Sequence, residues 1–182
     1  MKPDTHSTHL SPLPMADRDH IQGPIDAPIK LVEYGDYECP YCGEAYQVVK
    51  AIQERLAERL CFAFRNFPLT TVHPHAQHAA EAAEAGGAQG RFWEMHDLLY
   101  ENQNALEDED LAGYASALSL DAERLMHEVE TGAHAARIRE DFRSGARHDV
   151  NGTPSFFING VRYDGRMDVA GLLVALTGEP KG

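Results

Sequence analysis

The chain has 182 residues, 43% of them hydrophobic, which is long enough for a single domain with a substantial core. Its 29 Asp and Glu residues outnumber the 16 Lys and Arg residues, so the formal net charge is −13. This charge suits a soluble protein and disfavours sequence-independent binding of nucleic acid or of an anionic membrane surface.

Residues 1–22 are predicted to form a flexible leader, because they contain prolines, scattered histidines and no continuous apolar stretch. A secretory signal needs a basic start and an apolar core of about 7–15 residues, and neither is present. As written, the sequence predicts a cytoplasmic protein; a periplasmic or extracellular location is the alternative if a signal peptide was removed. His6, His9 and His20 are interpreted as disordered tail residues.

The stretch from Ile29 to Tyr34 is rich in β-branched and aromatic residues and ends at Gly35, which predicts a short buried strand before a turn. Further along, apolar residues recur at spacings of three and four, as in an amphipathic helix with one buried face. They are Ala45, Val48, Val49, Ile52 and Leu56. Cys39 then falls at or near the N-cap, and Pro40 takes the first helical position, where its missing N–H is harmless.

Cys39 and Cys42 form a C-x-x-C motif whose two sulfurs lie within one helical turn. A thiol at a helix N-terminus faces unpaired N–H groups and the positive end of the helix dipole, and both favour the thiolate. We assign Cys39 as the exposed nucleophile that attacks a partner disulfide and Cys42 as the resolving thiol. Half of a zinc site is the alternative, disfavoured because only Cys61 remains and no second ligand pair follows at zinc-finger spacing.

Residues 60–67 predict a second central strand before the break at Pro68. Cys61 is interpreted there as a small buried hydrophobic residue, with a regulatory thiol as the alternative. From about residue 73 to 148 the sequence is alanine-rich and charged with helical periodicity, which predicts a helical block. Its expected helices span residues 75–88, 91–101, 108–118, 121–130 and 132–147. Three N-terminal caps are expected, at Asp108, Asp121 and Thr131.

Three histidines at the start of this block, His73, His75 and His78, are interpreted as solvated side chains. Pro74 separates the first pair, and no acidic or cysteine partner is fixed nearby in the sequence, so no metal site is expected.

The C-terminal part predicts a hairpin followed by a helix. Residues 156–158 and 161–163 flank Asn159-Gly160, a strong signal for a two-residue hairpin turn. Asp168 is expected to cap a final helix that ends at Gly178.

Two motifs together resemble a known family. The first is Cys39-Pro40-Tyr41-Cys42, which follows a predicted strand. The second is Val150-Asn151-Gly152-Thr153-Pro154-Ser155-Phe156-Phe157-Ile158, in which Pro154 comes just before another predicted strand. From about Gly23 to the C-terminus, the chain resembles the thioredoxin superfamily and specifically its DsbA-like branch. The resemblance implies an α/β thioredoxin fold over residues 23–182, with an inserted helical subdomain at about residues 73–148.

The resemblance also implies roles for residues around Pro154. In the family the matching proline is cis and lies against the active-site disulfide, and the backbone of the preceding residue, here Thr153, pairs with an extended substrate. From the residues alone, an ordinary trans proline opening an edge strand is the alternative. Pro40 and Tyr41, between the cysteines, are expected to contact the substrate.

Glu33 matches the position of a buried acidic residue in thioredoxin-like proteins. Burial would raise the pKa of Glu33 and let it take the proton of Cys42 during resolution; a solvated glutamate on an edge is the alternative. The Pro-Tyr dipeptide departs from the Pro-His of DsbA and leaves the redox direction open. With Asp36 and Glu38 close in sequence, the pKa of Cys39 is predicted to be lowered, though less than in a strong oxidant.

The sequence therefore predicts a thiol–disulfide oxidoreductase that acts on protein or peptide disulfides through Cys39 attack and Cys42 resolution. It is expected to be a monomer without a bound cofactor, served by an unidentified redox-recycling partner. The alternatives within the enzyme class are a cytosolic disulfide reductase or isomerase and, less favoured, a glutathione-transferase-like enzyme. Outside that class, the alternative is a non-catalytic metal-binding or chaperone module that uses the same cysteines.

Overall fold

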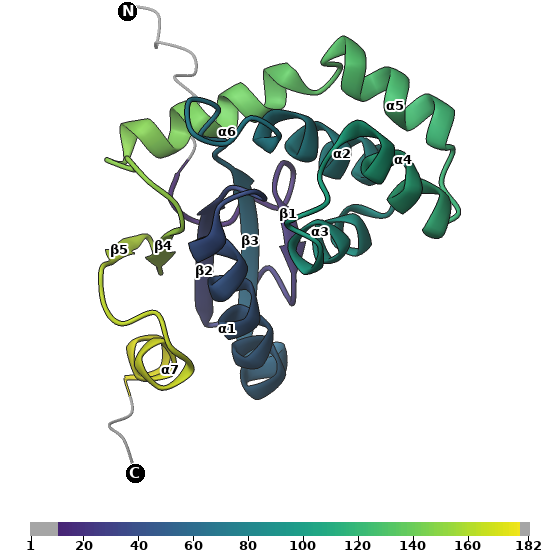
Figure 1. The fold of residues 1–182 in the computed structure, drawn as a ribbon. Helices are drawn as coiled ribbons and strands as arrows, with labels where there is room; N and C mark the ends of the chain where they lie inside the picture. The colour runs from purple at the N-terminus through teal and green to yellow at the C-terminus, as the bar shows by residue number, and fades with distance from the viewer. Residues whose placement is uncertain (1–10, 179–182) are drawn as a thin grey trace, which may run out of the picture.

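A mixed five-stranded sheet lies at the centre of the computed structural model, which describes residues 11–178 (Figure 1). Its strands follow the order β1-β3-β2-β4-β5. They are β1 (His20–Gln22), β2 (Ile29–Gly35), β3 (Leu60–Asn66), β4 (Ser155–Ile158) and β5 (Val161–Tyr163). Strands β2 and β3 run parallel, and the other neighbours are antiparallel. The two parallel strands are buried almost throughout, because helices cover both faces of the sheet.

Alternate residues of β2 belong to different cores. Leu31 lies in the larger core, with side chains of α1 (Pro40–Leu56) and α7 (Val169–Thr177). Val32 and Tyr34 lie in the smaller core on the opposite face. Because side chains alternate along a strand, Glu33 shares the face of Leu31, which is the face that α1 covers.

Helix α1 begins where the sequence predicted. Cys39 is its N-cap and Pro40 is its first residue. The helix makes the crossover that two parallel strands require, so the dithiol lies at the end of the sheet where β2 finishes. Its buried side chains keep the predicted spacing, apart from the partly exposed Val48, and are Cys42, Ala45, Tyr46, Val49, Ile52 and Leu56.

The predicted helical block corresponds to five helices within residues 76–147. They are α2 (Ala76–Ala88), α3 (Phe92–Glu101), α4 (Asp108–Ala117), α5 (Ala122–Thr131) and α6 (Ala135–Arg147). Helices α2 to α5 gather at one side of the sheet, while α6 runs back along it (Figure 1). Helix α6 covers the smaller core, where Phe142 stacks on Phe67 with ring centroids 4.1 Å apart.

Two of the predicted caps in this block are wrong. The N-cap of α4 is Glu107, whose backbone N–H donates to Asp110 at 3.0 Å, so the cap lies one residue earlier than expected and Asp108 is the first residue of the helix. Thr131 is the last residue of α5, and its hydroxyl donates back to the His127 carbonyl at 2.7 Å. The cap at Asp121 is confirmed by its bond from the Arg124 N–H.

The C-terminal elements follow the prediction. Asn159 and Gly160 both have positive φ, as the turn between β4 and β5 requires. Asp168 caps α7 by accepting the Gly171 N–H at 2.7 Å.

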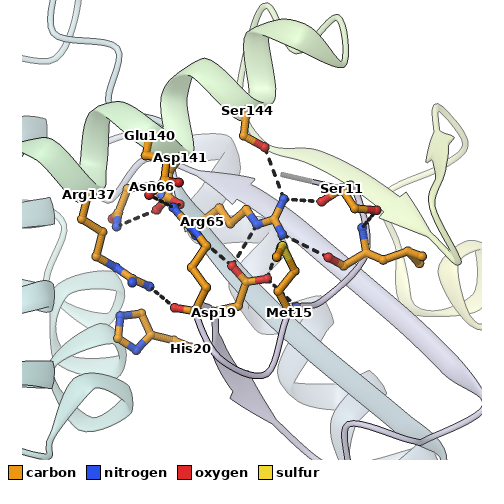
Figure 2. Close-up of polar contacts among 12 residues, drawn as sticks. Ser11, Met15, Asp19, His20, Arg65, Asn66, Arg137, Glu140, Asp141 and Ser144 are labelled. Carbon is orange, nitrogen blue, oxygen red and sulfur yellow. Dashed lines mark hydrogen bonds and ion pairs between the residues drawn. The ribbon is translucent and has the colours of Figure 1, made fainter. Parts of the chain in front are cut away.

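The prediction of a flexible leader is wrong for residues 11–22, while residues 1–10 lie outside the described part. Strand β1 pairs antiparallel with β3. Figure 2 shows the fully buried Arg65 of β3 donating to both carboxylate oxygens of Asp19 and to the Ser11 carbonyl. Arg65 also donates to the Leu13 carbonyl at 3.0 Å. A buried guanidinium needs such partners, and the segment is held in place because it supplies them.

The prediction of a disordered His20 is also wrong. Its Nε2 lies 2.9 Å from a carboxylate oxygen of Glu84, and its ring stacks on Phe92 at a centroid distance of 3.4 Å. His6 and His9 lie outside the described residues. Within residues 11–178, no helix is both long enough and apolar enough to cross a membrane.

Candidate active site

The two cysteines of the motif are free thiols at the start of α1, near the end of β2. The Cys42 N–H donates to the Cys39 carbonyl at 3.1 Å, which forms the first turn of α1. Cys39 is only 4% exposed and Cys42 is fully buried, so the expectation of an exposed nucleophile is wrong for this form. The reason is the chain before β4: the Thr153 carbonyl lies 3.5 Å from the Cys39 Sγ.

The pKa of the Cys39 thiol is lowered to about 5. The main cause is the hydrogen bond that Cys42 donates to the Cys39 sulfur, which outweighs the opposing effect of burial. Thr153 and the backbone N–H groups of Cys42 and Tyr41 lower this pKa further. The pKa of Cys39 is lowered, as predicted. The N–H groups at the helix terminus do not act alone, however, because the Cys42 thiol stabilises the Cys39 thiolate as well.

The acidic residues beside the motif are held mainly by partners in the loop between β3 and α2. Buried Asp36 accepts the N–H groups of Glu38 and Leu69, and it lies 2.8 Å from Nδ1 of His73. Glu38 accepts the backbone N–H of His75 and lies 2.9 Å from its ring, which raises the pKa of His75. The expectation that these histidines lack acidic partners is therefore wrong.

Glu33 lies beneath the dithiol and is 2% exposed, so its predicted burial is confirmed. Among the described residues its Oε1 has no hydrogen-bond partner. Burial, with a smaller contribution from the negative charge of Cys39, raises the pKa of Glu33 to about 8. Burial also raises the pKa of Cys42, and the hydrogen bond to Cys39 and the charge of Glu33 add to this effect.

Gly35 leaves room for the Glu33 carboxyl group. A Cβ at this position would lie 3.1 Å from the Glu33 Oε1, 2.7 Å from the Tyr100 hydroxyl and 2.5 Å from the Phe64 ring. Any other residue would therefore push against two buried rings.

The Thr153–Pro154 peptide bond is cis, which confirms the prediction. Thr153, Pro154 and Tyr41 line an open groove beside the dithiol, with a volume of about 340 Å³. Tyr41 is 69% exposed and forms part of its rim. Pro40 is exposed at the start of α1 but does not line this groove.

Sequence reasoning missed Gln103, which follows α3. Its Nε2 donates to the carbonyls of Tyr37 and Cys39, at 2.9 and 2.8 Å, and so holds the turn that carries the nucleophile. The Tyr37 hydroxyl in turn lies 3.0 Å from Nδ1 of buried His96, whose pKa burial lowers to about 3. Nothing in the local sequence around Gln103 signals these contacts.

Other residues with metal-binding or redox potential lie apart from this site. In residues 11–178 no three His, Cys, Asp or Glu side chains are grouped so that they could hold a metal ion. His78 contacts Asp108 at 2.6 Å on the surface. Cys61 is fully buried in β3, and burial raises the pKa of its thiol, which suits a core residue.

The chain matches one family model and is similar in sequence to several curated proteins. The family model described as thioredoxin matches residues 15–177. The chain is 48% identical over 161 residues to a Na⁺/H⁺ antiporter NhaA 1 of Salinispora arenicola, covering 88% of this chain and 24% of that protein. It is 46% identical over 162 residues to NhaA 3 of Salinispora tropica, with the same coverage. The chain thus spans about a quarter of the length of these curated relatives.

Solved structures match over nearly the whole chain. Oxidised BdbD from Bacillus subtilis has a TM-score of 0.82 at 23% identity, covering 94% of this chain and 98% of that one. A thioredoxin-like oxidoreductase from Silicibacter pomeroyi has a TM-score of 0.77 at 24% identity, covering 88% and 90%. MdbA, a thiol-disulfide oxidoreductase from Actinomyces oris, has a TM-score of 0.73 at 18% identity, covering 94% and 92%. At these identities the similarity establishes the fold.

Proposed function

Because the chain belongs to the thioredoxin family, we propose that it is a thiol–disulfide oxidoreductase that acts on protein or peptide disulfides. The expected α/β thioredoxin fold with an inserted helical subdomain is confirmed. The observation that carries the proposal is the opposite shift of two adjacent thiols: the pKa of Cys39 is lowered to about 5, and the pKa of Cys42 is raised. One sulfur is thus ready to attack while the other keeps its proton.

The reaction follows from these two states. The Cys39 thiolate attacks one sulfur of a substrate disulfide, and the other sulfur leaves with the bonding electrons and takes up a proton. Cys42 then loses its proton and attacks the Cys39 sulfur, which releases the second substrate thiol and closes the Cys39–Cys42 disulfide. The substrate gains two electrons, and the reverse sequence oxidises a substrate dithiol.

Glu33 is proposed to accept the proton that Cys42 loses during resolution. The mutual effects of Glu33 and Cys39 or Cys42 on their pKa values support this role, since such effects require the groups to be close. A carboxyl group with a pKa of about 8 is also well matched to proton transfer near neutral pH.

We propose that the pair favours oxidation of its substrates. The groups that stabilise the Cys39 thiolate stabilise the reduced protein, which makes the disulfide a better electron acceptor. Among residues 11–178, no specific contact favours the alternative functions, which are a reductase or isomerase and a metal-binding or chaperone module. We propose no ion transport for this chain, because the aligned region is about a quarter of each antiporter.

The test uses reduced protein and a peptide whose single cysteine forms a disulfide with 2-thiopyridine. We expect wild-type protein to release thiopyridone and then the peptide thiol, while Cys42→Ser stops at a Cys39–peptide disulfide that mass spectrometry detects. Cys39→Ser should react only at the rate of a buried thiol, and the control Cys61→Ser should match wild type. Release by Cys39→Ser at the wild-type rate would contradict the assignment.

A further inference from the structure

The groove beside Cys39 carries negative charge without any positive charge on its walls. Two of its lining side chains, Glu44 and Asp164, are carboxylates, and none is Lys, Arg or His. The lining residues are Tyr41, Glu44, Thr153, Pro154, Phe156, Tyr163, Asp164, Gly165 and Met167. The rest of the wall is therefore mainly aromatic or apolar.

The two carboxylates come from different elements of the fold. Glu44 lies on α1 three residues after Tyr41, so the two side chains share one face of the helix. The Glu44 side chain is exposed and forms no hydrogen bond or ion pair with any residue in the described range 11–178. Asp164 follows β5, has a 73% exposed side chain and pairs with Nε of Arg162 at 2.8 Å.

Two arginines lie close in sequence to Asp164, and one of them, Arg162, is its ion-pair partner. Arg162 also donates from its guanidinium to the Asp149 carbonyl at 2.6 Å. Arg166 pairs with Asp168 at 2.5 Å, and it is absent from the groove lining although its neighbours Gly165 and Met167 are part of it. Neither arginine belongs to the groove lining, so Glu44 presents there a carboxylate that is unpaired within residues 11–178, while Asp164 shares its charge with Arg162.

We propose that this groove binds a Lys or Arg side chain of an extended polypeptide substrate, close to the cysteine that reacts with Cys39. Carboxylates attract a cationic head, and the faces of Tyr41 and Tyr163 suit both the cation and its apolar stem. The position close to the reacting cysteine follows from Thr153, which lines the groove and contacts the Cys39 sulfur. The inference rests on the proposed function and names its substrate class.

The same charge disfavours acidic thiols. A peptide with Glu beside its cysteine would bring a carboxylate close to Glu44 and Asp164, and like charges at short range repel. The net charge of −13 adds a weaker, longer-range effect of the same sign. Both effects shrink as salt is added, because the groove is open to solvent.

The experiment measures how fast reduced protein releases thiopyridone from three peptides. The leaving group is the same and uncharged in all three. The peptides are 2-pyridyl disulfides of equal length that differ only in having Arg, Gln or Glu on both sides of the cysteine. In each reaction Cys39 attacks the peptide sulfur, the bond to the pyridyl sulfur breaks, and thiopyridone leaves with the electron pair and takes a proton. The rates with 2-mercaptoethanol, a neutral thiol, correct for the intrinsic reactivity of each peptide.

We expect corrected rates in the order Arg, Gln, Glu, with a spread that narrows in high salt. An exposed charge pair changes an equilibrium by about two- to fivefold, so Glu44→Gln with Asp164→Asn should reduce the Arg-to-Gln ratio by roughly tenfold. The control is Glu54→Gln, an exposed glutamate ten positions further along α1, which should keep the wild-type ratio.

Equal corrected rates for the three peptides would overturn the inference and leave the proposed function intact. An Arg preference that persists unchanged in the double variant would also overturn it, because the charge would then act from elsewhere. Release no faster than that of Cys39→Ser with every peptide would refute the proposed function and the inference together.

Discussion

At the scale of single residues, the chemistry of the dithiol depends on which group holds a proton. Cys42 donates its S–H to Cys39 and so keeps the proton that it must later lose. The group that removes this proton has to reach a sulfur that is fully buried. Glu33 lies on the face of β2 that α1 covers, its Oε1 has no hydrogen-bond partner within residues 11–178, and its charge raises the pKa of Cys42, so it is the acceptor that we propose.

Glu33→Gln should slow resolution without slowing attack. Glutamine fills the same space but cannot accept the proton, so release of the peptide thiol from the mixed disulfide should fall about a hundredfold. The pH dependence that Glu33 imposes on this step should vanish as well. Stopped-flow measurement separates the two steps, since thiopyridone release reports attack and peptide thiol release reports resolution. Equal slowing of both steps would indicate a structural role; Glu54→Gln serves as the control.

Which residues were predictable from the sequence depends on how local their role is. Cys39 and Cys42 lie in one helical turn, and the burial of Glu33 follows from apolar neighbours on the same strand. Gln103 holds the Cys39 carbonyl from 64 positions away, and no local pattern marks a glutamine for that contact. The partners of Asp36 were missed for the same reason, because they come from the loop after β3.

At the scale of elements, a buried charge network joins the N-terminal segment to β3 and α6 (Figure 2). Asp19 accepts from Arg65, and its neighbour Arg18 pairs with Asp141 of α6. Asp141 in turn accepts the backbone N–H of Asn66 at the end of β3. These contacts connect three segments that are distant in sequence.

Asp19→Ala should destabilise the protein by about 3–5 kcal/mol, because it leaves the Arg65 guanidinium buried without its carboxylate. The double variant Asp19→Ala with Arg65→Met should recover part of this loss, since it removes the unpaired charge as well. Denaturant unfolding followed by circular dichroism gives both values. The control Asp17→Ala changes an exposed neighbour and should have little effect. A loss for Asp19→Ala no larger than for this control would contradict the argument.

The leader was mispredicted because its composition carries no periodic apolar pattern. Its order comes from polar contacts with Arg65, and an arginine inside an apolar strand says only that some partner is needed. The helices of the inserted block were predictable to within three residues at each end, since periodicity and breakers are local signals. The cap at Glu107 is a local capping box with Asp110. At the N-cap of α6 the His134 N–H donates to Glu81 of α2, a distant contact that the local sequence does not determine.

At the scale of the whole molecule, the dithiol couples redox state to stability and pH. The pKa of Cys39 falls from an ordinary value of 9.0 to about 5 on folding. A lowered pKa adds stability that is fully present above 9.0 and is lost as the pH falls through about 5. The pKa of Glu33 rises from 4.5 to about 8, so its contribution is full below 4.5 and is lost as the pH rises through about 8.

The stability of the reduced protein relative to the oxidised protein should therefore increase with pH between about 5 and 9. Only the reduced form carries the Cys39 thiolate. We expect Glu33 to stay buried when the disulfide forms, so that its contribution largely cancels in the difference. The slope can reach about 1.4 kcal/mol per pH unit. Denaturant unfolding at several pH values, with and without a phosphine reductant, measures it. In the control, Cys39→Ser with Cys42→Ser, the reductant should have no effect at any pH. A difference that stays constant across this range would mean that folding leaves the pKa of Cys39 unchanged, and the proposed preference for oxidising substrates would lose its physical basis.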